Sequence, residues 1–113
     1  MSTGKPAGLQ ITERAFQSQV RQLAATLGWR VYCAWLSIRS PKGYPDLTCV
    51  HETQQRVLWL EIKSESGKPT AAQLSWNATL VAAGQEAHIV RPSDWDFIVG
   101  TLRPQTIRKE KEK

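Results

Sequence analysis

The most informative segment of the sequence is Val57-Leu58-Trp59-Leu60-Glu61-Ile62-Lys63. Side chains alternate between the two faces of a strand, so the aliphatic residues at 58, 60 and 62 share one face. The opposite face starts with Val57 and Trp59 and ends with Glu61 and Lys63. We therefore expect a strand with one face in the core and a carboxylate and an ammonium at the C-terminal end of the other.

The residues before this strand predict one helix and two further strands. Thr12 is expected to cap a helix that ends at Gly28. One face of that helix carries apolar side chains at helical spacing: Phe16, Val20, Leu23 and Leu27. Residues 30–36 predict a strand and 37–43 a loop. Residues 46–51 predict a strand that the polar turn 52–55 joins to 57–63 as an antiparallel hairpin.

The residues after this strand predict a helix, a strand and a last helix. Residues 64–69 form a polar connection, and 70–83 predict a helix that Gly84 ends. Residues 87–90 predict a short strand. Ser93 is expected to cap the last helix, which runs to Leu102 with Asp94 and Asp96 in its first turn. The order α-β-β-β-α-β-α predicts an α/β protein of α+β type, with a mixed sheet flanked by helices.

Length and charge indicate one domain with a basic tail. The chain has 113 residues, 15 Lys+Arg against 10 Asp+Glu, and a formal charge of +5. This length suits a single core, which we place at residues 12–102. Residues 1–11 are expected to be a flexible N-terminus and 103–113 a basic, disordered tail. Such a tail can attract a polyanion through counterion release, although short charged termini are often only solvated.

Membrane insertion and disulfide bonding are not expected. The longest apolar run, residues 31–36, is far shorter than the roughly 20 residues that span a bilayer. Residues 1–10 lack the apolar stretch of a secretory signal, which predicts a cytoplasmic protein. A bacterial or phage-infected cell is the expected host, although nothing in the residues identifies it. Cys33 and Cys49 form no CxxC pair and have no His cluster, so we interpret both as small buried hydrophobic residues.

A candidate reaction centre comes from the hairpin. Antiparallel pairing would bring Asp46, at the start of one strand, close to Glu61 and Lys63 at the end of the next. Two converging carboxylates repel each other unless a hard cation lies between them, and Mg²⁺ accepts such a sparse shell. An adjacent ammonium can orient a water and neutralise phosphoryl oxygens. The three residues therefore suffice for metal-assisted phosphodiester hydrolysis, although each alone could be a turn residue or a solvated charge.

Two further residues have both a structural and a functional interpretation. Glu13 falls on the same side of its helix as Phe16, so its carboxylate is expected to point inward, but a first-turn Glu commonly only complements the helix dipole. Gln73 completes a capping-box pattern with Thr70. It could equally hold the attacking water or the phosphate, and the sequence does not separate these roles.

Four motifs in order resemble those of the PD-(D/E)xK nuclease superfamily, and more narrowly of its VRR-NUC family. They are Glu13, Gly43-Tyr44-Pro45-Asp46-Leu47, Glu61-Ile62-Lys63, and Gly67-Lys68-Pro69-Thr70-Ala71-Ala72-Gln73. The resemblance covers residues 12–102. It implies a restriction-endonuclease-like core that uses Mg²⁺ or Mn²⁺.

The resemblance also implies a role for each residue. Asp46 and Glu61 would be metal ligands, together with the backbone carbonyl of Ile62. Lys63 would position or activate the water. Glu13 would bind or polarise a metal through its water shell, and Gln73 would support the site from its helix.

Stand-alone members of the family resemble Holliday-junction resolvases, which implies a homodimer that cuts branched DNA. Arg39, Lys42 and Lys68 are the candidate DNA-binding residues. The loop 37–42 supplies cations but no acidic or His residue, so no metal ligand is expected between Glu13 and Asp46. Two alternatives stay open: a non-catalytic nucleic-acid-binding module of the same fold, and a restriction-type, sequence-specific endonuclease.

Overall fold

The computed structural model describes residues 10–34 and 42–104. Its elements, in chain order, are α1 (Glu13–Thr26), β1 (Arg30–Cys33), β2 (Leu47–His51), β3 (Arg56–Ile62), α2 (Ala71–Ala82), β4 (Glu86–Val90), the 3₁₀ turn η1 (Pro92–Asp94) and α3 (Trp95–Leu102). Apart from η1, this order confirms the predicted α-β-β-β-α-β-α arrangement.

The four strands form one mixed sheet in the order β1-β2-β3-β4. The pairs β1–β2 and β2–β3 are antiparallel, and β4 runs parallel to β3. A parallel neighbour requires a crossover connection, which the segment containing α2 provides. The predicted mixed α+β sheet and its central hairpin are confirmed.

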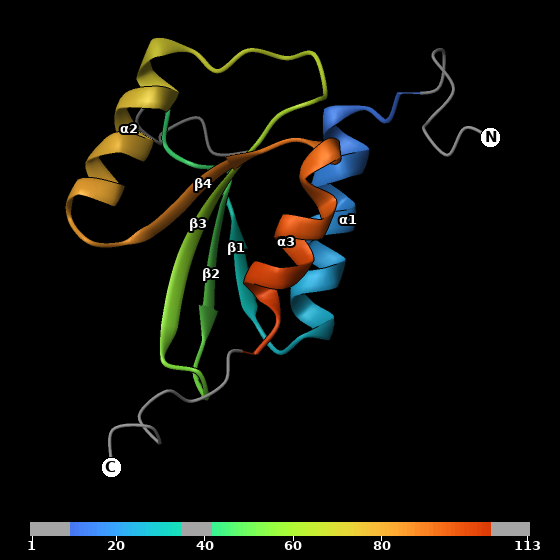
Figure 1. Cartoon of the computed structure of the whole chain (residues 1–113), viewed down its shortest axis with the longest axis vertical. Helices are drawn as coiled ribbons and strands as arrows, with labels where there is room; N and C mark the ends of the chain where they lie inside the picture. The colour runs from blue at the N-terminus through green and yellow to red at the C-terminus, as the bar shows by residue number, and fades with distance from the viewer. Residues whose placement is uncertain (1–9, 35–41, 105–113) are drawn as a thin grey trace.

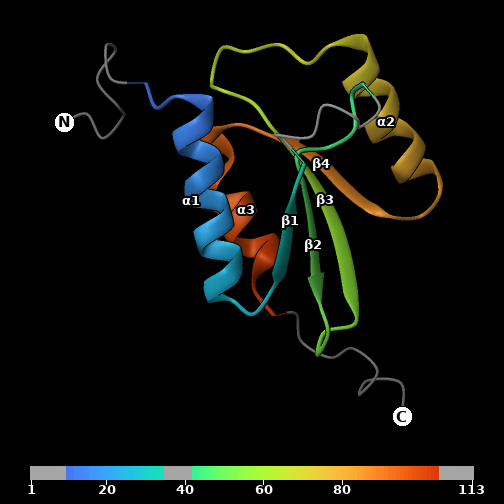
Figure 2. The same cartoon turned by 180° about the vertical axis from the view of Figure 1, so that it is seen from behind.

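The helices cover the two faces of the sheet unequally. Helices α1 and α3 lie side by side on one face, and α2 lies beyond the other (Figures 1 and 2). The core lies between the sheet and the α1–α3 pair. Its buried members are Phe16, Val20, Ala24, Trp29, Leu47, Cys49, Leu58, Leu60, Ile62, Val90, Ile98 and Leu102. Helix α2 contributes no buried residue, so the core has a single apolar layer.

Helix α1 starts as predicted, but its buried stripe is shifted. The Thr12 hydroxyl accepts the Ala15 N–H at 3.0 Å, which confirms the cap. Val20 and Ala24 are fully buried, whereas Leu23 and Leu27 pack only partly against the core. The buried stripe of α1 therefore passes through Ala24 rather than through Leu23 and Leu27.

The sheet face beneath α2 is only partly covered. Tyr32 is 59% exposed and Val50 40% exposed on this face. Residues 58, 60 and 62 of β3 are buried toward α1 and α3, as the alternation predicted, but Glu61 on the opposite face is buried as well. The charged end of β3 therefore belongs to the more open side of the sheet.

The start of the last helix differs from the prediction. Ser93 does not cap it, because residues 92–94 form the 3₁₀ turn η1 and α3 begins at Trp95. The Asp94 carboxylate turns back to accept the Arg91 N–H at 2.8 Å. Its side chain therefore closes the turn before the helix, and Asp96 takes the first-turn position.

Several strand ends also differ from their predicted positions. Strand β3 runs from Arg56 to Ile62, yet the Lys63 N–H still donates to the Val90 carbonyl at 2.9 Å. Strand β1 ends at Cys33. The predicted strand residues 35–36 and loop residues 37–41, Arg39 among them, lie outside the described residues. So do residues 1–9 and 105–113.

Both cysteines are free thiols. Cys49 is fully buried, and burial raises its pKa to about 12. Cys33 is only half-buried and accepts a hydrogen bond from Gln17 Nε2 at 2.9 Å, so its interpretation as a buried hydrophobic residue holds only in part. Within the described residues, no helix is both long and apolar enough to cross a membrane.

Candidate active site

Strand register brings the two predicted carboxylates together. Leu47 pairs with Leu60 and Thr48 with Trp59. Extending this register by one residue places Asp46 opposite Glu61. The start of the second strand therefore meets the end of the third, as the hairpin predicted, and both carboxylates project from the face opposite the core.

Asp46 is held by the backbone of the neighbouring strand. Its Oδ2 accepts the Ile62 N–H at 2.8 Å. Burial raises the pKa of Asp46 above its usual value, and the charge of Glu13 adds to this rise. The hydrogen bond from Ile62 and the charge of Lys63 oppose it. Asp46 is thus oriented by a backbone donor while its negative charge is only partly compensated.

Glu61 is the most buried charged residue of the site, with 3% of its surface exposed. Gln73 Nε2 donates to its Oε2 at 2.6 Å. Its Oε1 is buried and finds no hydrogen-bond partner among the described residues. Burial, with Asp46 as the next cause, raises the pKa of Glu61 to about 8, although Lys63 opposes the shift. One oxygen of Glu61 is therefore oriented by Gln73, and the other lacks a partner.

Lys63 follows the end of β3, two residues after Glu61. Its charge lowers the pKa of Asp46 and of Glu61, which places the ammonium within electrostatic reach of both. Lys63 Cδ lies 3.6 Å from where a Cβ on Gly67 would be, so the lysine side chain passes alongside this glycine. The structure thus brings Asp46, Glu61 and Lys63 into one neighbourhood.

Gln73 has the capping role and the site contact in a single conformation. Its Oε1 accepts the Thr70 N–H at 2.8 Å, and its backbone N–H donates to Thr70 Oγ1 at 3.1 Å. This is the predicted capping box. Because Oε1 must face that backbone donor, Nε2 is directed at Glu61. The capping role is therefore confirmed, whereas a contact of Gln73 with the attacking water or the phosphate stays a prediction.

A glycine brings the loop before Asp46 against helix α2. Gly43 has φ +83, and a Cβ there would lie 2.5 Å from the backbone carbon of Ala72. No side chain fits in that space, and the left-handed backbone also favours glycine. The glycine of the Gly43-Tyr44-Pro45-Asp46 motif thus permits a contact between this loop and the first turn of α2.

Tyr44 links three elements around the site, a role that the sequence analysis did not assign. Trp59 Nε1 donates to the Tyr44 hydroxyl at 3.1 Å. The Tyr44 ring meets the Trp76 ring edge-on, with centroids 5.1 Å apart. The loop, β3 and α2 are therefore joined on the same side of the sheet as Glu61. The aromatic residue between Gly43 and Pro45 is the sequence feature that could have indicated this role.

Glu13 is placed differently from the prediction. Its side chain is exposed rather than directed inward, because it is the first residue of α1, and the buried face begins one turn later at Phe16 and Gln17. Its charge still raises the pKa of Asp46 and of Glu61. Among the candidate DNA-binding residues, Lys42 and Lys68 are exposed; Arg39 was noted above as outside the described residues.

The carboxylates fit a divalent cation with a sparse protein shell. Within residues 10–34 and 42–104, no three His, Cys, Asp or Glu side chains gather as a metal-binding cluster. Mg²⁺, however, commonly takes only one or two carboxylates and completes its shell with water and substrate oxygens. The partnerless Oε1 of Glu61, the raised pKa of Asp46 and the neighbouring backbone of Ile62 are compatible with such an ion.

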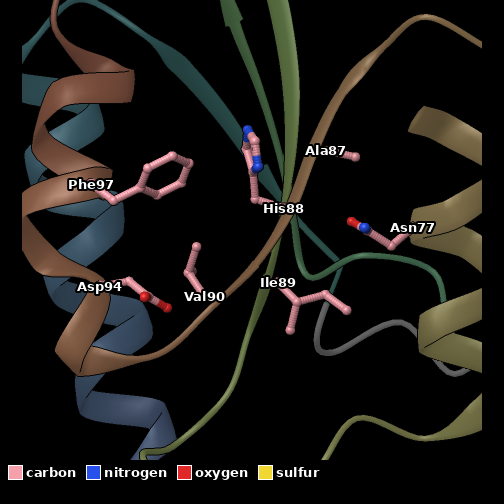
Figure 3. A pocket seen from close by; sticks show the side chains of 7 residues that line it. All are labelled: Asn77, Ala87, His88, Ile89, Val90, Asp94 and Phe97. Carbon is pink, nitrogen blue, oxygen red and sulfur yellow. The ribbon is translucent and has the colours of Figure 1, made fainter.

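A cavity of about 460 Å³ lies elsewhere, at the β4 edge of the sheet (Figure 3). Its lining residues are Asn77, Ala87, His88, Ile89, Val90, Asp94 and Phe97. His88 and Phe97 meet edge-on with centroids 4.9 Å apart, and burial lowers the pKa of His88. None of the predicted catalytic residues lines this cavity, so the carboxylate site is a separate feature.

Comparison with known proteins supports the fold. No family model matches the sequence, and no curated protein matches it. A solved structure described as "VRR_NUC domain protein" is 17% identical and has a TM-score of 0.57; the match covers 83% of this chain and 87% of that chain. The two chains share a fold. At this identity the similarity establishes the VRR-NUC-type architecture, in agreement with the predicted fold class, and nothing about individual residues.

Proposed function

We propose that this protein is a metal-dependent endonuclease that hydrolyses DNA phosphodiester bonds. The observation that carries the proposal is the pairing of Asp46 with a buried Glu61 whose Oε1 has no partner among the described residues, beside Lys63. A VRR-NUC-type fold around this pair adds support.

Asp46 and Glu61 would hold Mg²⁺ or Mn²⁺ with the backbone carbonyl of Ile62. The ion, when bound, supplies a nucleophilic hydroxide at neutral pH and charge stabilisation for the phosphoryl group. The Ile62 N–H keeps Asp46 in place through its 2.8 Å hydrogen bond. Gln73 keeps Glu61 in place through a hydrogen bond from Nε2 to Oε2, so the partnerless Oε1 would be available to bind the cation.

Lys63 and Glu13 have supporting roles in this proposal. The Lys63 ammonium would orient the attacking water and neutralise charge that develops on the phosphoryl oxygens. Its proximity to both carboxylates, seen in the pKa of each, supports this role. The exposed Glu13 would act through a water of the metal shell rather than as a direct ligand.

The proposed substrate is branched DNA and the proposed active form is a homodimer. Two sites at a fixed separation would allow paired cuts across a junction, which a single small site does not. The formal charge of +5 favours a polyanionic substrate. Exposed Lys42 and Lys68, in the segments that lead into Asp46 and Gln73, are candidates to contact phosphates.

The test is a cleavage assay on linear, flapped and four-way DNA, with Mg²⁺, Mn²⁺ or a chelator. We expect metal-dependent cutting by the wild type and none by Asp46→Asn, Glu61→Gln or Lys63→Met. Asp96→Asn is the matched control, because Asp96 is an exposed carboxylate on α3. Full activity in any of the three site variants would refute the role given to that residue.

The same panel separates the alternatives. Binding of every DNA without cleavage would favour a non-catalytic module, and cuts at one base sequence in any DNA shape would favour a restriction-type enzyme. A sizing measurement that detects only monomer, with and without a four-way junction, would count against paired cuts by a dimer.

A further inference from the structure

The segment between Lys63 and the helix that carries Gln73 is hydrogen-bonded to a part of the chain that is distant in sequence. Residues 64–69 connect Lys63 with helix α2, which carries Gln73. This segment runs past the connection from β4 to α3 (Figure 1). The contact between the two connections is made by hydrogen bonds centred on Arg91.

Arg91 donates to two carbonyls of the connection. Its Nε donates to the Glu65 carbonyl at 3.2 Å, and its Nη2 donates to the Gly67 carbonyl at 2.5 Å. The guanidinium is a rigid planar fork, so two carbonyls in the same segment are held at a fixed separation. In return, the Glu65 carboxylate accepts the Ser93 N–H at 2.9 Å. The two connections are thus joined in both directions.

The segment that Arg91 holds lies beside the side chain of Lys63. Gly67, whose carbonyl Arg91 holds, also donates its N–H to Ser64 Oγ at 3.0 Å. The side chain of Lys63 passes beside Gly67, with Cδ 3.6 Å from a Cβ placed there. The Lys63 backbone is fixed separately, by its N–H donating to the Val90 carbonyl at 2.9 Å. Gly67 therefore bounds the path of the lysine side chain.

We propose that Arg91 is a positioning residue for Lys63: by holding the carbonyls of Glu65 and Gly67 it sets the wall along which the lysine reaches the two carboxylates. This inference rests on the proposed nuclease function. It assigns no contact between Arg91 and the substrate. Asp46 and Glu61 accept their hydrogen bonds from Ile62 and Gln73, and neither accepts one from Arg91.

The test compares Arg91→Met and Arg91→Lys with the wild type in cleavage kinetics. Methionine removes both hydrogen bonds, whereas lysine keeps the charge and N–H donors but lacks the rigid planar fork of the guanidinium. We expect kcat to fall about ten- to hundredfold in Arg91→Met, the cost of a small misplacement of a catalytic group. Arg91→Lys should recover part of the loss. KM and Mn²⁺ affinity, measured by calorimetry, should stay within about twofold of the wild type.

Arg56→Met is the matched control. Arg56 also ties neighbouring strands, through Glu86 at 2.6 Å, but it lies at the opposite end of β3 from Lys63. Its loss should lower Tm without lowering kcat. Amide hydrogen exchange adds a direct readout. The Gly67 N–H should exchange faster in Arg91→Met than in the wild type, and at the wild-type rate in Arg56→Met.

The outcomes separate this inference from the function on which it rests. A wild type that cuts no DNA removes the proposed function, and the positioning role with it. An active wild type with an unchanged kcat in a folded Arg91→Met variant overturns the positioning role alone. A fall in Mn²⁺ affinity that matches the fall in kcat would also overturn it, because the carboxylates rather than Lys63 would then be disturbed.

Discussion

The amide group of Gln73 joins the N-terminus of helix α2 to the Glu61 carboxylate. Its Oε1 accepts the Thr70 N–H at 2.8 Å while its Nε2 donates to Glu61 Oε2 at 2.6 Å. One side chain thus fixes both the start of a helix and the orientation of a buried acid. The arrangement depends on an amide, because the two ends of the group must differ: one accepts and the other donates.

Gln73→Glu should separate the two roles of this amide. The new carboxylate can still accept the Thr70 N–H, but it faces Glu61 with an acceptor in place of a donor. A hydrogen bond to a charged group is worth about 1.5–3 kcal/mol, so we expect cleavage to fall about ten- to hundredfold with helix content unchanged. Gln73→Ala should also lose the cap and unfold at a lower temperature. Equal activity of Gln73→Glu and the wild type would contradict the role in the site.

The contribution of Glu61 to the stability of the metal-free protein should fall as the pH rises from about 4.5 toward 8. Burial, with the charge of Asp46 as the next cause, raises the pKa of Glu61 from 4.5 to about 8. The folded state therefore binds the proton more tightly than the unfolded state between these values, and its stability is lost as the proton leaves. One such group gives a slope of up to about 1.4 kcal/mol per pH unit.

The measurement is urea unfolding in a chelator at four pH values between 5 and 8, for the wild type and Glu61→Gln. His88, whose pKa burial lowers, contributes an opposite slope to both proteins, so this slope cancels in the difference between them. The difference that is left reports Glu61 together with its effect on the neighbouring Asp46. Parallel stability curves for wild type and variant would contradict the raised pKa.

Metal binding should release protons near neutral pH. A carboxyl with a pKa of about 8 is mostly protonated at pH 7, whereas a metal ligand must be deprotonated. We expect Mn²⁺ binding to release about one proton at pH 7 and to weaken as the pH falls. Calorimetry in two buffers of different ionisation enthalpy measures this number, and Glu61→Gln should not show it. Heats that are equal in both buffers would show that Glu61 does not lose a proton to the ion.

Gly43→Ala should be far more damaging than Gly84→Ala, although both glycines have left-handed backbones with φ +83 and +84. A Cβ at residue 84 meets nothing within 4 Å, whereas at residue 43 it would lie 2.5 Å from the backbone of Ala72. The control should cost about 1–2 kcal/mol for the backbone conformation. Gly43→Ala adds overpacking and should cost about 2–5 kcal/mol.

The activity of these two variants is the second readout. Gly43→Ala must displace the loop that ends at Asp46. Its cleavage rate should therefore fall even at temperatures at which the variant is folded, whereas Gly84→Ala should keep the wild-type rate. Similar losses of stability in both variants, measured by urea unfolding, would show that the backbone at Gly43 does not pack tightly against α2.

Local pattern was sufficient for most of the architecture. The alternation along residues 57–63, the Thr12 cap and the Thr70–Gln73 capping box depend on interactions within a few residues, and each appears in the structure. The hairpin turn between β2 and β3 sets their register, and the register alone places Asp46 opposite Glu61. These features could be predicted because they depend on short stretches of chain.

Long-range packing decided the features that the sequence left open or predicted wrongly. Glu13 is exposed because the core begins one turn beyond it. The 3₁₀ turn at residues 92–94 is an exception to long-range control, because a local hydrogen bond from the Arg91 N–H to Asp94, three residues away, replaced the Ser93 cap. The partnerless oxygen of Glu61 and the hold of Arg91 on Gly67 depend on which buried groups meet across elements distant in the chain. Sequence alone determined the strands, caps and order of the acids; burial, which exists only once the layers pack, decided how strongly those acids need a cation.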